Sequence, residues 1–211
     1  MGSDTGVTVT GSASVETIPD IVVAALGVDV RAADISTALR TAEASLARMR
    51  DALLAGGVDR TDLRSTRSNI WREDRTEDSG ATTTVIHVRL GLQATLRAVA
   101  VAGELVHAAL AAAGTDASMD SLDFAVSDAG PALVRARDAA FDDARHVAAA
   151  YAARAGRALG RVISIVEGSG GEGPAPRAAY AVMEKAVRSM PVEPGQQSVT
   201  AAVTVTWELA D

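Results

Sequence analysis

Three glycines late in the chain have the spacing that most resembles a site for chemistry. Gly168, Gly170 and Gly173 fit G-x-G-x-x-G, and the apolar run Val162–Val166 just before them predicts a strand. In a dinucleotide site this pattern joins a strand to a helix, and the free N–H groups of that helix face the pyrophosphate. The spacing therefore raises the hypothesis of a nucleotide-dependent enzyme.

The residues that follow these glycines do not suit a phosphate site. Pro174 and Pro176 come next, and proline has no N–H to offer a phosphate. The acidic residue at the expected distance, Glu193, belongs to a predicted turn, "PVEPG", instead of the end of a second parallel strand. We therefore interpret residues 168–178 as a connector rich in glycine, proline and alanine, and we expect no bound cofactor.

The histidines and carboxylates form no recognisable catalytic or metal-binding pattern. His87, His107 and His146 have no second histidine at ligand spacing. The pair Asp142-Asp143 lies on a predicted helix, where neighbours in sequence do not face each other. The remaining clustered aspartates lack the spacing of a calcium loop: Asp116, Asp120, Asp123 and Asp128. The sequence thus predicts no catalytic, cofactor-binding or metal-binding residues, and a protein that is not an enzyme.

Composition excludes further classes. The 211 residues are 48% apolar and only 3% aromatic, which suits a packed core built from alanine, valine and leucine. A formal net charge of −7 argues against a nucleic-acid partner, which would need clustered basic side chains. The chain has no cysteine, so disulfides and thiolate metal sites are excluded, and no apolar run is long enough to span a membrane.

The hydrophobic periodicity predicts strands and helices in the order ββαββαβαββ. Alternating residues predict a pair of strands before and after the turn Ile18-Pro19-Asp20, and we expect these two to form a hairpin. Steps of three and four predict helical stripes at Ile35, Leu39, Ala42, Leu46, Met49 and Leu53, and again at Leu133, Ala136, Ala140, Ala144, Val147 and Tyr151. Alternation of this kind favours an α+β fold with a mixed or antiparallel sheet and helices on one face.

Five segments, in order, resemble those of one protein family: "VTVTGSASVETIPDIVVAALGVDV", "LLAGGVDRTDLRST", "SLDFAVSD", "ARDAAFDDARHVAAAYAARAGRALGRVISIVEGSG" and "PVEPGQQSVTAAVTVTWEL". From about residue 7 to residue 209 the chain resembles the SIMPL-domain family, a bacterial family named after a eukaryotic protein that interacts with a Pelle-like kinase. The resemblance implies an α+β fold and offers no catalytic residues to transfer. We expect residues 1–211 to form one domain of this kind, or two interleaved α+β subdomains.

Two functions remain open from the sequence. The resemblance implies a non-enzymatic homo-oligomer, ring- or channel-like, with an envelope or stress-related role, and the long alternating strands at both ends favour contact between copies. The alternative is an adaptor that binds another protein or a small ligand through the hairpin 72–80 or the loop 168–178. We expect no nucleic-acid partner and no membrane-spanning segment.

The sequence and the resemblance predict different locations. The first residues, "MGSDTGVTVTG", lack the basic region and apolar run of a signal peptide, so the sequence as written predicts a cytoplasmic protein. Many bacterial members of the family are exported, so the resemblance implies a periplasmic or exported protein whose native gene encodes a signal ahead of Val7.

Overall fold

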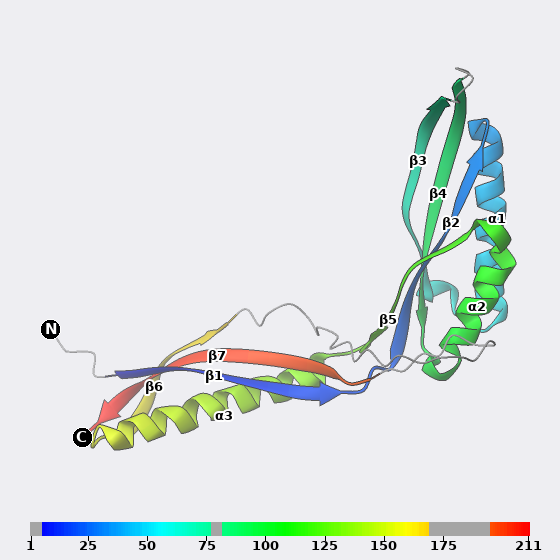
Figure 1. The fold of residues 1–211 in the computed structure, drawn as a ribbon. Coiled ribbons are helices and arrows are strands. Elements are labelled where there is room, and N and C mark those ends of the chain that lie inside the picture. Colours follow the sequence, from blue (N-terminus) through cyan, green and yellow to red (C-terminus); the bar gives the residue numbers. More distant parts are fainter. Residues whose placement is uncertain (1–5, 77–81, 169–194) are drawn as a thin grey trace, which may run out of the picture. The chain divides into compact units, whose positions relative to one another are not determined.

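The computed structural model describes residues 6–76, 82–168 and 195–211, which form two compact units (Figure 1). Unit 1 contains residues 6–18, 126–168 and 195–211, and unit 2 contains residues 19–125. The order of elements is the predicted ββαββαβαββ: β1 (Gly6–Thr17), β2 (Ile21–Ala32), α1 (Ile35–Ala55), β3 (Leu63–Thr76), β4 (Thr82–Leu96), α2 (Ala102–Ala113), β5 (Ala117–Ala125), α3 (Gly130–Arg154), β6 (Ala158–Glu167) and β7 (Gln197–Ala210). The α+β prediction is confirmed, with two antiparallel sheets.

The predicted hairpin of the first two strands is wrong. β1 pairs antiparallel with β7, from Gly6 opposite Glu208 to Thr17 opposite Gln197, whereas β2 pairs with β4 and β5. The turn at Ile18-Pro19-Asp20 therefore carries the chain from unit 1 into unit 2. Local alternation predicts each strand correctly but contains no information about a partner almost two hundred residues away.

Unit 1 is a three-stranded sheet, in the order β1-β7-β6, with α3 packed along one face (Figure 1). Every fourth residue of α3 is a buried alanine: Ala132, Ala136, Ala140, Ala144, Ala148 and Ala152. This stripe follows one i±4 ridge of the helix, and its small side chains bring the helix axis close to the sheet. The predicted stripe was partly wrong, because Tyr151 is exposed and Leu133 and Val147 are half-buried at its margin.

The closest approach of α3 to the sheet occurs at Gly11 of β1. A Cβ atom on Gly11 would lie 2.2 Å from the carbonyl oxygen of Ala140 and 2.4 Å from the nitrogen of Ala144. Such distances are far below van der Waals contact, so only glycine fits. The carboxylate of Asp143 adds a polar contact, because its Oδ2 accepts a 3.1 Å hydrogen bond from the backbone N–H of Ser12.

Unit 2 is a four-stranded sheet, in the order β3-β4-β2-β5, with α1 and α2 contacting one face. The alternation in β2 directs one face of the strand into the core, where Val22, Ala24, Leu26, Val28 and Val30 are all buried. From α1 the core receives Met49 and Leu53, and from α2 it receives Val106. Asp34 caps the start of α1, because its Oδ1 accepts a 2.9 Å hydrogen bond from the N–H of Thr37. The helix ends at Ala55, and Gly57 follows with φ 91°.

The β3–β4 pair continues beyond the rest of its sheet as a two-stranded ribbon. Pairing of β2 with β4 ends at Ala32 opposite Ile86, while β3 and β4 remain paired as far as Thr76 opposite Thr82. Figure 1 shows this ribbon projecting past the end of β2. Residues 77–81, the tip of the predicted 72–80 hairpin, lie outside the described residues.

Candidate functional site

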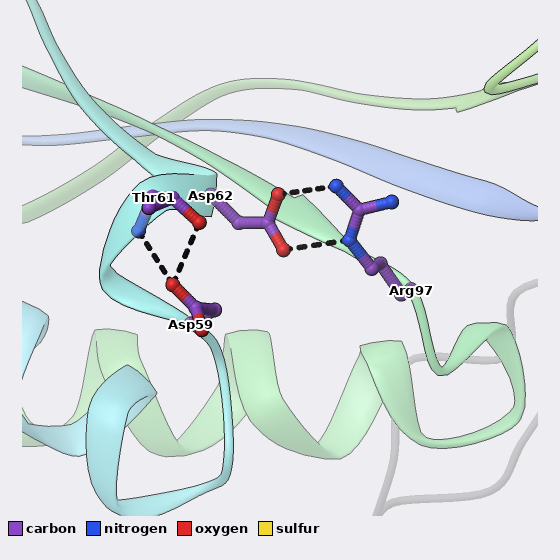
Figure 2. Close-up of polar contacts among 4 residues, drawn as sticks. All are labelled: Asp59, Thr61, Asp62 and Arg97. Atoms are coloured by element: carbon purple, nitrogen blue, oxygen red, sulfur yellow. Dashed lines mark hydrogen bonds and ion pairs between the residues drawn. The ribbon is translucent and has the colours of Figure 1, made fainter.

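The first polar cluster lies where α1 leads into β3 and joins the end of β4 (Figure 2). Asp59 precedes the 3-10 turn Arg60–Asp62, and its Oδ1 accepts hydrogen bonds from the backbone N–H (2.8 Å) and the hydroxyl (2.6 Å) of Thr61. Asp62 accepts two bonds from Arg97, at 2.8 Å from Nε and 2.7 Å from a terminal nitrogen. This fork-to-fork pair fixes the turn against Arg97, the first residue after β4.

The electrostatics of this cluster suit structure better than proton transfer. The hydrogen bonds with Thr61 lower the pKa of Asp59 from its ordinary 3.8. The hydrogen bond and charge of Asp62 raise the pKa of Arg97 above its already high ordinary value. Both groups therefore stay ionised near neutral pH and are poor general acids or bases. An open pocket of about 350 Å³ adjoins them, with Gly57, Val101 and Leu105 on its other walls.

A second polar cluster joins the two helices of unit 2 around the buried side chain of Ser45. The hydroxyl of Ser45, fully buried on α1, donates a 2.6 Å hydrogen bond to Asp116. Arg48 donates to that same hydroxyl and, through Nε at 3.0 Å, to the carbonyl oxygen of Ala112 at the end of α2. A cation at the last carbonyls complements the helix dipole. The cluster joins α1 to the end of α2, and sequence analysis missed it because Ser45 interrupts an apolar stripe.

The third cluster contains His87, the one histidine of the three that is buried. His87 is 4% exposed and lies on the face of the sheet opposite to the helices, where Trp71 stacks on its ring with centroids 4.7 Å apart. Its Nε2 lies 2.9 Å from the carboxylate of Glu73, and its Nδ1 has no hydrogen-bond partner among the residues that the structure describes. His107 and His146 are exposed. The His87 cluster lies where the four-stranded sheet narrows to the β3–β4 ribbon, so it holds the base of the ribbon.

The structure gives the predicted aspartates separate roles in stabilising the fold. Asp143 contacts β1, as described above, which is more than the solvated charge expected of it. Asp120 forms an ion pair with Arg89 across the sheet, and Asp128 accepts a 2.9 Å hydrogen bond from Gly130 at the start of α3. Within the described part of the chain, no three His, Asp or Glu side chains are grouped closely enough to hold a metal ion.

Only the first residue of the glycine motif is described. The N–H of Gly168 donates a 3.0 Å hydrogen bond to the carbonyl oxygen of Ala202, so Gly168 continues the pairing of β6 with β7. Gly170, Gly173, Pro174, Pro176 and Glu193 lie outside the described residues, as does nearly all of the loop 168–178. The described residues therefore do not test the hypothesis of a nucleotide site, which stays a prediction from the sequence.

Among the described elements, β6 has the largest set of exposed apolar side chains. It lies at one edge of the sheet in unit 1 and, among the described residues, pairs with β7 alone. Its exposed residues are Val162 (40%), Ile163 (51%), Ile165 (57%) and Val166 (60%). Four large apolar side chains exposed on one short strand are unusual in a monomer, so they indicate contact with another molecule.

A groove of about 280 Å³ runs between this strand and α3. Its walls are largely apolar and include Ala140, Phe141, Ile165 and Val203. An ion pair between Arg137 of α3 and Glu167 of β6, 2.6 Å apart, lies beside it. The groove exists because α3 covers β1 and β7 more fully than β6.

These observations define the class: an α+β protein of two units, each an antiparallel sheet with helices on one face, whose most unusual surface is apolar. The model of the SIMPL family, described as a protein of unknown function (DUF541), matches residues 7–207. The chain therefore belongs to the SIMPL family. A comparison with curated proteins finds no match. Among the described residues, no helix has the length and apolar character needed to cross a membrane.

Proposed function

We propose that this chain is a non-enzymatic protein that assembles with copies of itself. The observation that carries the proposal is the row of apolar side chains on β6, each at least 40% exposed on an edge strand. An edge strand of this kind offers both backbone hydrogen-bonding groups and apolar area to a neighbour. The envelope or stress-related role, and a ring- or channel-like arrangement, follow from the family resemblance alone.

Charge supports association through this strand and not through the rest of the surface. With a net charge of −7, two copies repel each other over much of their surfaces. Between Arg161 and Glu167, however, β6 carries no charged side chain. Burial there removes apolar area from water without bringing like charges together.

The test is the mass of the native protein in solution. Light scattering on a sizing column, over a range of micromolar concentrations, should show a mass that is a multiple of the monomer's 21.6 kDa. A strictly monomeric protein across that range would contradict the proposal. Assembly that persists in the Ile165→Lys, Val166→Lys double variant would show that β6 is not the surface.

A second candidate function is binding of another protein through the β3–β4 ribbon. Ile70 (45% exposed) and Trp71 (38% exposed) lie at its base, and exposed aromatic residues are common anchors in interfaces. Replacing Ile70 and Trp71 by serine should then abolish capture of the partner while leaving the assembled mass unchanged. If partner binding and self-assembly were lost together, the ribbon would belong to the surface of self-assembly, and separate partner binding would be contradicted.

A further inference from the structure

The sequence of β6 is close to a palindrome. From Arg161 to Glu167 it is R-V-I-S-I-V-E, so valine and isoleucine repeat in mirror order on either side of Ser164. The two ends carry opposite charges. A strand with this pattern is complementary to a second copy of itself when the two copies run antiparallel.

We propose that two copies of the chain pair through β6, antiparallel, about a two-fold axis at Ser164. Arg161 then lies opposite Glu167 of the second copy, Val162 opposite Val166, and Ile163 opposite Ile165. A parallel pairing would place arginine beside arginine and glutamate beside glutamate, which repel. The proposal rests on the proposed function, because it specifies the surface by which self-assembly begins.

The position of β6 in its sheet permits this pairing. β6 is an edge strand in the part of the chain that the structure describes, so its outer N–H and C=O groups face away from β7. Joining two such edges gives one six-stranded sheet in which the two copies of β6 are central. The contact is the same on both copies, so it closes on itself as a dimer and does not extend into a fibre.

The opposite edge of the sheet is less suited to adding a strand. There the carboxylate of Asp143 already accepts the hydrogen bond of the Ser12 N–H on β1. An incoming strand would have to displace this contact and would meet the charged side of α3. The contrast between the two edges favours β6 as the one that pairs.

The dimer requires a local change in β6. In the single chain, the pairing of β6 with β7 shifts between Leu159 and Val162 and again between Val162 and Ser164, which indicates bulges. As a result, Arg161 pairs with Glu208 of β7 while Glu167 pairs with Arg137 of α3. In the proposed register, the side chains of Arg161 and Glu167 lie on the same face of the strand. Each leaves its partner within the chain, and Arg161 of one copy pairs with Glu167 of the other. Exchanging these ion pairs costs little, because ion pairs between exposed side chains contribute little to stability. The main cost of the dimer is the removal of the bulges, which also brings Val162 and Val166 to the same face.

Cross-linking tests the position of the axis. The chain has no cysteine, so a single introduced thiol reports a single contact. Directly opposed residues in antiparallel strands have Cα atoms roughly 4.5–5.5 Å apart, which a disulfide can bridge. We expect the full-length Ser164→Cys protein to form a linked dimer under mild oxidation. Ser12→Cys, exposed on the β1 edge of the same sheet, is the matched control and should stay monomeric.

Charge reversal tests the direction of pairing. Arg161→Glu places glutamate opposite glutamate twice in the dimer, and Glu167→Arg places arginine opposite arginine twice. Each single variant should raise the dissociation constant about tenfold at low salt. Mixing the two single variants should restore tight association, because each then meets its opposite charge. The double variant should also recover, although neither Glu208 nor Arg137 regains its own partner within the chain.

The outcomes separate this inference from the proposed function. If the unmodified protein is monomeric at all concentrations, self-assembly and the β6 dimer both fail. If it assembles while Ser164→Cys cross-links no better than Ser12→Cys, self-assembly stands and the β6 dimer is overturned. Weakening by the single charge variants without recovery on mixing, or cross-linking at Val166→Cys in place of Ser164→Cys, also overturns the proposed register.

Discussion

The two units differ in the size of the side chains that pack their helices against their sheets. In unit 1 a single helix lies against the strands through alanines, so closely that its backbone meets Gly11. In unit 2 two helices pack on the sheet through larger side chains such as Met49 and Leu53. The distance between packed elements is set by the side chains between them. Unit 1 should therefore be sensitive to added atoms, and unit 2 to removed ones.

The two tryptophans of the chain allow the units to be followed separately. Trp207 is buried in unit 1 beside Phe141, whereas Trp71 is partly exposed in unit 2. In a Trp71→Phe background, fluorescence reports the unfolding of unit 1 alone. Hydrogen exchange along α1 reports unit 2.

The largest effect should come from an added side chain at the closest contact of unit 1. Gly11→Val places Cβ within 2.2 Å of the Ala140 carbonyl oxygen, and neither backbone can move without losing the stripe. We expect a loss of about 3 kcal/mol or more in the stability of unit 1, read from Trp207. Gly168→Ala is the control, because its Cβ would lie at an ordinary 3.4 Å from Ala202. Equal effects from the two variants would contradict the close-packing account.

A removed side chain should have the next largest effect, and in unit 2. Leu53→Ala leaves a cavity in the core between α1 and the sheet, at an expected cost of about 2–5 kcal/mol. Hydrogen exchange along α1 should accelerate while Trp207 reports no change. Ile35→Ala, half-exposed on the same helix, serves as the control and should cost under about 1 kcal/mol. A comparable loss at Ile35 would argue against a core centred on Leu53.

A moderate effect should follow from removing the polar contact between α3 and β1. Asp143→Ala deprives the Ser12 N–H of its acceptor and should cost unit 1 about 1 kcal/mol. Asp142→Ala removes the neighbouring carboxylate and should leave Trp207 unfolding unchanged. If both substitutions act alike, the effect comes from the charge of the helix and not from the contact.

The smallest effect should be the acid sensitivity of unit 2. Hydrogen bonds with Thr37 lower the pKa of Asp34, and those with Thr61 lower that of Asp59, both from 3.8. Each folded pKa lies below the unfolded one, so the stabilisation is complete above 3.8 and is lost as the pH falls through the lowered value. Asn in place of both can still accept the capping hydrogen bonds without titrating. The double variant should therefore lose less stability than the unmodified protein below that pH, as measured by exchange in α1.

The sequence predicted the elements well because their periodicity is local. Val22 to Val30 alternate, and Gly56-Gly57 end α1, as expected from neighbouring residues alone. The pairing of β1 with β7 was missed because no local pattern records it. The stripe of α3 differs from the predicted one at Tyr151 because the helix lies so close to the sheet that alanines fill the buried positions. The clusters around Ser45 and His87 were missed because each assembles from distant segments.

The placement of β7 has a consequence for the order in which the molecule forms during synthesis. β7 is the middle strand of its sheet, yet it is made after every other element. At a translation rate of about 5–20 residues per second, β1 leaves the ribosome ~10–40 s before its partner strand β7 is complete. All elements of unit 2 are present well before then, so unit 2 can fold first. During that interval β1 and the alanine stripe of α3 lack their central strand. Their apolar side chains stay exposed until β7 arrives, and a chaperone that binds them would act at this stage.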